Sequence, residues 1–118
     1  MFKHPELALP NADSATADDR KFTGYLFNPS NSVGYAKGQA FTSRLGYDIN
    51  NYEELKQEIM LRAAKYPATF KASDQYGDSY EQKMVLYGIK NTPANVIVGW
   101  KVKDDRAWLT STYIKELK

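Results

Sequence analysis

Residues 94–115 read ANVIVGWKVKDDRAWLTSTYIK, two alternating strand-like runs separated by the turn Asp104-Asp105. In the first run, Val96, Val98 and Trp100 occupy one set of alternate positions, and mostly polar residues occupy the other. A turn this short joins antiparallel neighbours, because a parallel pair needs a crossover of a dozen or more residues. The stretch therefore predicts an antiparallel hairpin, 94–103 and 106–115, with one apolar face.

Two further strands are predicted upstream, at 68–73 and 79–87, around a turn that contains Gly77. Residues 68–73 alternate throughout, with Ala68, Phe70 and Ala72 on the apolar side. The other side of the four strands collects cationic and hydroxyl side chains: Lys71, Lys83, Lys101, Lys103, Ser111 and Tyr113. A sheet with one apolar and one cationic face is typical of a binding or catalytic surface.

Helical patterns fill the first half of the chain. Asp18 is expected to cap a helix over 18–27, Ser32 a helix over 33–45 that Gly46 ends, and Asn51 a helix that runs to about residue 66. Asn51 and Glu54 fit the capping-box spacing.

This order of patterns predicts an α+β fold in one domain, 1–118. It has an extended lead-in (1–17), a helical part (18–66) and a four-stranded antiparallel sheet (68–115), with the helices packed on one face of the sheet. Leu7 and Leu9 of the lead-in are expected to dock on this body.

Composition excludes several kinds of site. The chain has 118 residues, a net charge of +2 and no cysteine, so it has no disulfide framework and no thiolate metal site. His4 is the only histidine and lies in the lead-in, which rules out a two-histidine acid–base pair. We expect no metal and no cofactor, because no ligand cluster or glycine-rich phosphate loop is present. No apolar run approaches the roughly 20 residues that span a bilayer, so no membrane insertion is expected.

Lys37 and Arg44 are the first candidate site residues. Lys37 lies four positions from both Val33 and Phe41, and Arg44 follows on nearly the same helical stripe. A cation held on a half-buried face can bind a phosphate or stabilise developing negative charge. The alternative is that both stems pack while their charges reach water.

Ser111 and Tyr113 are the second candidates. They are expected on the face of their strand opposite Trp108 and Thr112, and near Lys101 and Lys103 on the adjacent strand. Lysines neutralise phosphates, hydroxyls form hydrogen bonds, and a tyrosine ring offers a stacking surface. An ordinary solvated sheet face is the competing interpretation.

Several short motifs together resemble a little-characterised bacterial family. They are Leu9-Pro10-Asn11-Ala12, the run from Lys21 to Pro29, Gly34-x-x-Lys37, Phe41-x-x-x-Leu45-Gly46-Tyr47, Tyr76-Gly77-x-x-Tyr80, Trp100 and the ending Leu109-Thr110-Ser111-Thr112-Tyr113. Members of this family occur as short proteins and as C-terminal domains of polymorphic toxins, including contact-dependent growth inhibition toxins. The order of helices and strands also resembles the barnase–EndoU–colicin–RelE superfamily of small ribonuclease toxins.

The resemblance implies metal-independent cleavage of RNA, often tRNA, by attack of a ribose 2′-hydroxyl that leaves a 2′,3′-cyclic phosphate. It also implies a cognate immunity protein or antitoxin, and action in the bacterial cytoplasm after delivery as the C-terminal part of a secreted toxin. The matching positions Lys37, Arg44, Ser111 and Tyr113 would be catalytic, and the matching Tyr76 and Tyr80 would bind RNA. If the substrate is RNA, the lysines of the cationic sheet face are expected to bind it as well: Lys71, Lys83, Lys101 and Lys103.

One position departs from the pattern. The family usually has His-Pro where this chain has Asn31 and Ser32. If that histidine carries a proton in the family, a non-enzymatic partner-binding module or an inactivated relative on the same scaffold is the alternative function.

Overall fold

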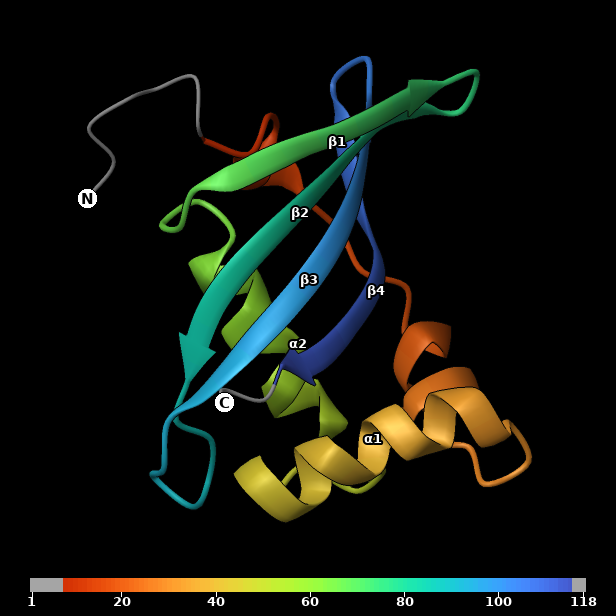
Figure 1. Cartoon of the computed structure of the whole chain (residues 1–118), viewed down its shortest axis with the longest axis vertical. Coiled ribbons are helices and arrows are strands. Elements are labelled where there is room, and N and C mark those ends of the chain that lie inside the picture. Colours follow the sequence, from red (N-terminus) through yellow and green to blue (C-terminus); the bar gives the residue numbers. More distant parts are fainter. Residues whose placement is uncertain (1–7, 116–118) are drawn as a thin grey trace.

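The computed structural model describes residues 8–115 and confirms the predicted α+β fold. The helical segments are η2 (Ala12–Ser14), η3 (Phe22–Leu26), α1 (Ser32–Leu45) and α2 (Tyr52–Arg62). The strands are β1 (Ala68–Asp74), β2 (Gly77–Leu86), β3 (Ala94–Lys103) and β4 (Arg106–Lys115). Figure 1 shows α2 behind the sheet, with α1 crossing its lower end beside the end of β4.

The sheet is an antiparallel meander in the order β1-β2-β3-β4. β3 and β4 have the predicted bounds, and β1 and β2 differ from prediction only at their ends. Val96, Val98 and Trp100 are buried under the helices, as their alternation predicts. The predicted alternation in 68–73 is wrong after Phe70. Lys71 is an extra residue in a β-bulge, so Ala72 pairs with Ser79 and joins the other face.

The helices differ from prediction mainly at their ends. The first is a short π-helix, η3, instead of a helix over 18–27. Asn31 caps α1 in place of Ser32, because its side-chain oxygen accepts a hydrogen bond from the Gly34 N–H at 3.0 Å. Gly46 ends α1 as predicted, with a left-handed φ of 86°.

The third helix, α2, ends at Arg62, and the predicted capping box at its start does not form. The Asn51 side chain makes no capping bond to α2. It accepts a hydrogen bond from the Asp48 N–H at 2.7 Å and donates one to the Gly46 carbonyl at 3.1 Å. Asn51 therefore fixes the connection between α1 and α2.

The lead-in is more ordered than an extended segment. It contains η2, and Leu9 is buried as expected, whereas Leu7 lies outside the described residues. Thr16 pairs with the start of β4: its N–H donates to the Ala107 carbonyl and its carbonyl accepts from the Leu109 N–H, both at 2.9 Å. The first half of the β4 edge is thereby covered.

A buried glutamine joins α2 to the sheet. Gln82 donates to the carbonyls of Ala63 and Tyr66, both at 2.8 Å, and accepts a hydrogen bond from the Trp100 indole at 2.9 Å. Each of these polar groups would be costly to bury without a partner. The network fixes the end of α2 against the centre of the sheet.

Two glycines bring α1 into backbone contact with η3. A Cβ atom at Gly34 would lie 2.4 Å from the Tyr25 carbonyl oxygen, and one at Gly38 would lie 1.7 Å from the Leu26 carbonyl oxygen. Both glycines belong to the buried stripe of α1, which continues with Phe41 and Leu45. Side chains at these positions would force the two helices apart.

Replacing Gly38 tests this contact. We expect Gly38→Ala to lower the free energy of unfolding by about 3 kcal/mol, since the new methyl group overlaps backbone that cannot rotate away. Gly24→Ala is the matched control, because its Cβ would meet only the Arg20 Cβ, at 3.9 Å. Urea unfolding of both variants gives the comparison, and equal stability would show that the contact tolerates a side chain.

Candidate active site

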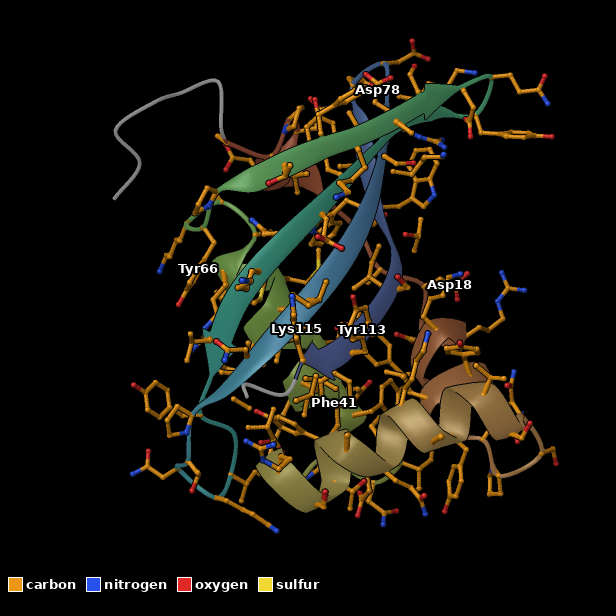
Figure 2. The ribbon with its side chains drawn as sticks, viewed as in Figure 1. Asp18, Phe41, Tyr66, Asp78, Tyr113 and Lys115 are labelled. Carbon is orange, nitrogen blue, oxygen red and sulfur yellow. The ribbon has the colours of Figure 1, made fainter. Side chains whose placement is uncertain are left out.

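Lys37 lies between two tyrosine rings. Its ammonium nitrogen is 5.5 Å from the ring centroid of Tyr25 on η3 and 5.7 Å from that of Tyr113 on β4. Both distances are within the range of cation–π attraction. The site therefore combines three elements, and the close packing of α1 on η3 sets the Lys37–Tyr25 part of it. Figure 2 shows Tyr113 where the end of β4 meets α1.

A β-bulge in β4 gathers hydroxyl groups close to Tyr113 in the same strand. Gly99 pairs with Ser111 and Trp100 pairs with Leu109, so Thr110 is the extra residue. A Cβ at Gly99 would lie 2.9 Å from the Ser111 hydroxyl oxygen and 3.0 Å from that of Thr110. Both hydroxyls therefore lie over Gly99, on the same face as Tyr113.

These hydroxyls border a cleft along the edge of β4. The cleft has a volume of about 430 Å³ and is lined by Asp18, Arg20, Lys21, Tyr25, Thr110 and Ser111. Tyr25 is shared between this cleft and the contact with Lys37. The cleft thus has hydroxyl groups on one wall and charged groups with a tyrosine on the other.

Asp18 is the acidic group of the cleft. Its carboxylate accepts hydrogen bonds from the Arg20 side chain, the shortest at 2.8 Å, and from the Arg20 N–H, also at 2.8 Å. These bonds to Arg20 lower the pKa of Asp18 to about 2. Asp18 is therefore ionised at neutral pH and cannot act there as a proton donor.

The arrangement suits an anionic ligand. Lys37 and Lys21 supply positive charge, the tyrosines supply rings that can stack, and Thr110 and Ser111 supply hydrogen bonds. Among residues 8–115, no group of three or more His, Asp or Glu side chains is placed to hold a metal ion. In the same part of the chain, no helix is long and apolar enough to cross a membrane.

Residues 8–116 match the protein family described as "Domain of unknown function (DUF6883)". The chain belongs to this family. A search of functionally curated proteins finds no significant match. A chain of the contact-dependent growth inhibition toxin–immunity protein complex from Klebsiella pneumoniae 342 has a similar structure. The TM-score is 0.66 at 19% sequence identity, over 84% of this chain and 98% of that chain. Similarity at this level of identity shows a shared fold.

The position at which this DUF6883 domain departs from the expected His-Pro pattern is a helix cap. Asn31 caps α1 and lies six residues before Lys37, about 9 Å along the helix axis. Six residues also turn the helix by about 240°, so the two side chains leave it in different directions. In this chain, the residue at position 31 therefore caps the N-terminus of α1.

The other residues predicted for catalysis are partly brought together. Tyr113 contacts Lys37, and Ser111 lines the adjoining cleft. Arg44 lies on the same side of α1 seven residues farther on, about 10 Å along the axis. Val33, predicted on the stripe of Lys37, is 62% exposed, so Lys37 lies beside the buried stripe and not within it.

The predicted face of Ser111 and Tyr113 needs a correction. The bulge at Thr110 shifts the alternation of β4, so Trp108 pairs with Lys101 and shares the face of Ser111 and Tyr113. The ammonium group of Lys101 points away from Ser111. It donates hydrogen bonds to Asp74 at 3.1 Å and to Ser79 at 3.0 Å.

The remaining residues predicted to bind RNA are scattered over the sheet. Lys71 and Lys83 are exposed on β1 and β2, and the Lys103 ammonium group donates to the Gln75 carbonyl at 3.1 Å. Tyr76 is exposed in the β1–β2 turn. Tyr80 lies on the helix-covered face and packs edge-on against Phe70.

Sequence reasoning missed Tyr25, Lys21 and Thr110 as parts of the site. The spacing of Gly34 and Gly38 was available as a signal, because two glycines four residues apart on a helix permit close backbone approach. It predicts a segment packed closely on this helix next to Lys37, but it does not identify that segment as the one that carries Tyr25. The alternating pattern of β4 gives no comparable signal for the bulge at Thr110.

The acidity of Asp18 can be measured directly. Its folded pKa, about 2, is below the ordinary value of 3.8, so its interactions with Arg20 are complete above pH 3.8 and are lost as the pH falls through about 2. We expect Arg20→Gln to raise the pKa of Asp18 toward 3.8, as measured by NMR titration of the carboxyl carbon. Lys56→Gln is the control, because Lys56 pairs with Asp19. An unchanged Asp18 titration in Arg20→Gln would contradict this assignment.

Proposed function

We propose that this domain is a toxin-type, metal-independent endoribonuclease that cleaves RNA, with tRNA as the expected substrate. The observation that carries the proposal is the position of Lys37 between Tyr25 and Tyr113, next to a cleft with the hydroxyls of Thr110 and Ser111. This constellation provides positive charge, stacking surfaces and hydrogen bonds at one place.

The reaction requires charge stabilisation above all. When a ribose 2′-oxygen attacks its own phosphodiester, the phosphorus becomes five-coordinate and its oxygens gain negative charge. The bond to the 5′-oxygen then breaks, which leaves a 2′,3′-cyclic phosphate and a 5′-hydroxyl. A positioned ammonium group such as that of Lys37 stabilises this charge in the transition state more than in the substrate.

Two proton transfers accompany the reaction. The 2′-hydroxyl loses a proton and the departing 5′-oxygen gains one. Tyrosine and lysine are side chains that enzymes use for such transfers, and Tyr113 and Lys37 are in contact here. We assign the proton transfers to this pair and the orientation of the phosphate to Ser111, supported by Thr110.

The other cations extend the contact with RNA. Arg44 continues the line of Lys37 along α1 and would contact a neighbouring phosphate. Exposed Lys71 and Lys83 would contribute a diffuse attraction on the sheet, and Lys103 and Tyr76 would act near the β1–β2 turn. Lys101 is expected to contribute less, because Asp74 already neutralises it. Tyr80 would help only by packing.

The toxin assignment rests on resemblance, fold and charge. The similar structure is a toxin–immunity protein complex, and it contains two kinds of chain. An immunity protein that covers a cationic RNA-binding surface tends to be acidic. The present chain has a net charge of +2 and a cationic site, which favours the toxin. A cognate immunity protein would be its partner, and the bacterial cytoplasm its place of action after delivery as part of a secreted protein.

A non-enzymatic partner-binding module is the second candidate. Asn31 in place of the family histidine favours it, because a group that could transfer protons is absent at that position. Expression in bacteria separates the two functions. Toxicity that the product of a neighbouring gene relieves supports the ribonuclease, whereas a neighbour that binds with no toxicity to relieve supports the module.

Lys37→Met provides the sharpest mutational test. Methionine retains the apolar stem but removes the charge, so we expect RNA cleavage to fall by about 10²- to 10³-fold with little change in stability. Lys37→Arg should retain part of the activity. Lys65→Ala, an exposed lysine after α2, is the control and should cleave at the normal rate. Normal cleavage by Lys37→Met would remove Lys37 from the mechanism.

A further inference from the structure

A second cleft continues along β4 from the proposed active site. Its volume is about 600 Å³, and it shares Asp18, Lys21 and Thr110 with the first cleft. Its far end is lined by Arg106 and Trp108. The two clefts therefore form one path beside β4, from Trp108 past Thr110 to Tyr25, whose ring Lys37 contacts.

Trp108 lies on this path because of the bulge at Thr110. A regular β4 would place Trp108 and Ser111 on opposite faces, whereas the extra residue puts them on the same face. Trp108 is partly exposed, unlike the other tryptophan, Trp100, which is 1% exposed. The bulge thus aligns Trp108 with the hydroxyls and with Tyr113.

The charge along this path is positive. The Arg106 guanidinium lies 5.2 Å from the Trp108 ring centroid. Neither Arg106 nor Lys21 forms an ion pair within residues 8–115, and the acidic group of the cleft, Asp18, is paired with Arg20. The path therefore favours a polyanion.

We propose that Trp108 and Arg106 form a binding subsite for an unpaired base of single-stranded RNA, a few nucleotides from the phosphate held at Lys37. Aromatic side chains beside a cationic groove bind single strands by stacking on their bases, without strong sequence preference. Trp108 pairs with Lys101 and Tyr113 pairs with Ile97, so the bulge leaves the two aromatic residues four strand positions apart. Four positions correspond to roughly 14 Å along the strand. A base can reach Trp108 only if it is not paired in a duplex.

The position of the scissile phosphate at Lys37 rests on the proposed function. The subsite at Trp108 is tested independently, by measuring how tightly RNA binds. The probe is a fluorescein-labelled 2′-O-methyl RNA octamer of mixed sequence, which cannot be cleaved by attack of a 2′-hydroxyl. Fluorescence anisotropy gives its Kd for the whole chain. The same octamer annealed to its complement is the duplex arm, and both are measured at one salt concentration.

We expect Trp108→Ala to weaken binding of the single strand by about 5- to 100-fold, as the loss of one stacked base predicts. Trp108→Phe should restore most of the affinity because it keeps an aromatic ring. Tyr87→Ala, which removes an exposed aromatic directly after β2, is the matched control and should bind normally. The duplex should bind more weakly than the single strand.

Normal binding by Trp108→Ala would overturn the subsite, and so would a duplex that binds as tightly as the single strand or an octamer that does not bind at all. The ribonuclease proposal is tested separately, by cleavage of RNA and not by binding of the octamer. Loss of binding in Trp108→Ala supports the subsite even if no RNA is cleaved, and normal binding removes it even if Lys37→Met abolishes cleavage.

Discussion

The rest of the structure depends on the backbone contact between α1 and η3. Gly34 and Gly38 let the helix approach the carbonyl oxygens of Tyr25 and Leu26 at distances that no side chain permits. This approach fixes where Lys37, on the next turn of α1, meets the Tyr25 ring. This one packing constraint therefore sets the geometry of the cation and the first aromatic ring, and β4 completes the site with Tyr113.

Two irregular segments, a π-helix and a β-bulge, bring the side chains of the candidate site together. The π-helix η3 presents Tyr25, and the bulge at Thr110 collects hydroxyls over Gly99 and moves Trp108 to their side of the sheet. Bulges and π-helical turns are frequent next to functional sites, because both re-aim side chains that regular elements would point elsewhere. The clefts along β4 lie beside these irregularities and are lined by the Thr110 and Ser111 hydroxyls, by charged groups and by Tyr25.

Most of the fold could be predicted from the sequence, and about half of the candidate site. Strong alternation in 94–103 and the short turn at Asp104-Asp105 gave β3 and β4 their bounds, since period-two patterns and turn residues are local signals. Lys37, Ser111 and Tyr113 were identified from their residue types and positions. Tyr25 and Trp108 were not, because their places depend on a helix–helix contact and an extra residue in β4.

The length of α2 also depends on tertiary contacts. The apolar spacing continues past Arg62 and predicts a helix to about residue 66. The helix ends earlier because Gln82 binds the carbonyls of Ala63 and Tyr66, where the chain turns.

The central claim is that the site at Lys37 cleaves RNA by 2′-hydroxyl attack without a metal ion. The most direct measurement incubates the purified protein with total bacterial RNA in EDTA and maps the new ends on a sequencing gel. We expect discrete fragments, in tRNA above all, with 2′,3′-cyclic phosphate at one end and 5′-hydroxyl at the other. RNA that stays intact, or that is cut only when a metal ion is restored, would contradict the account.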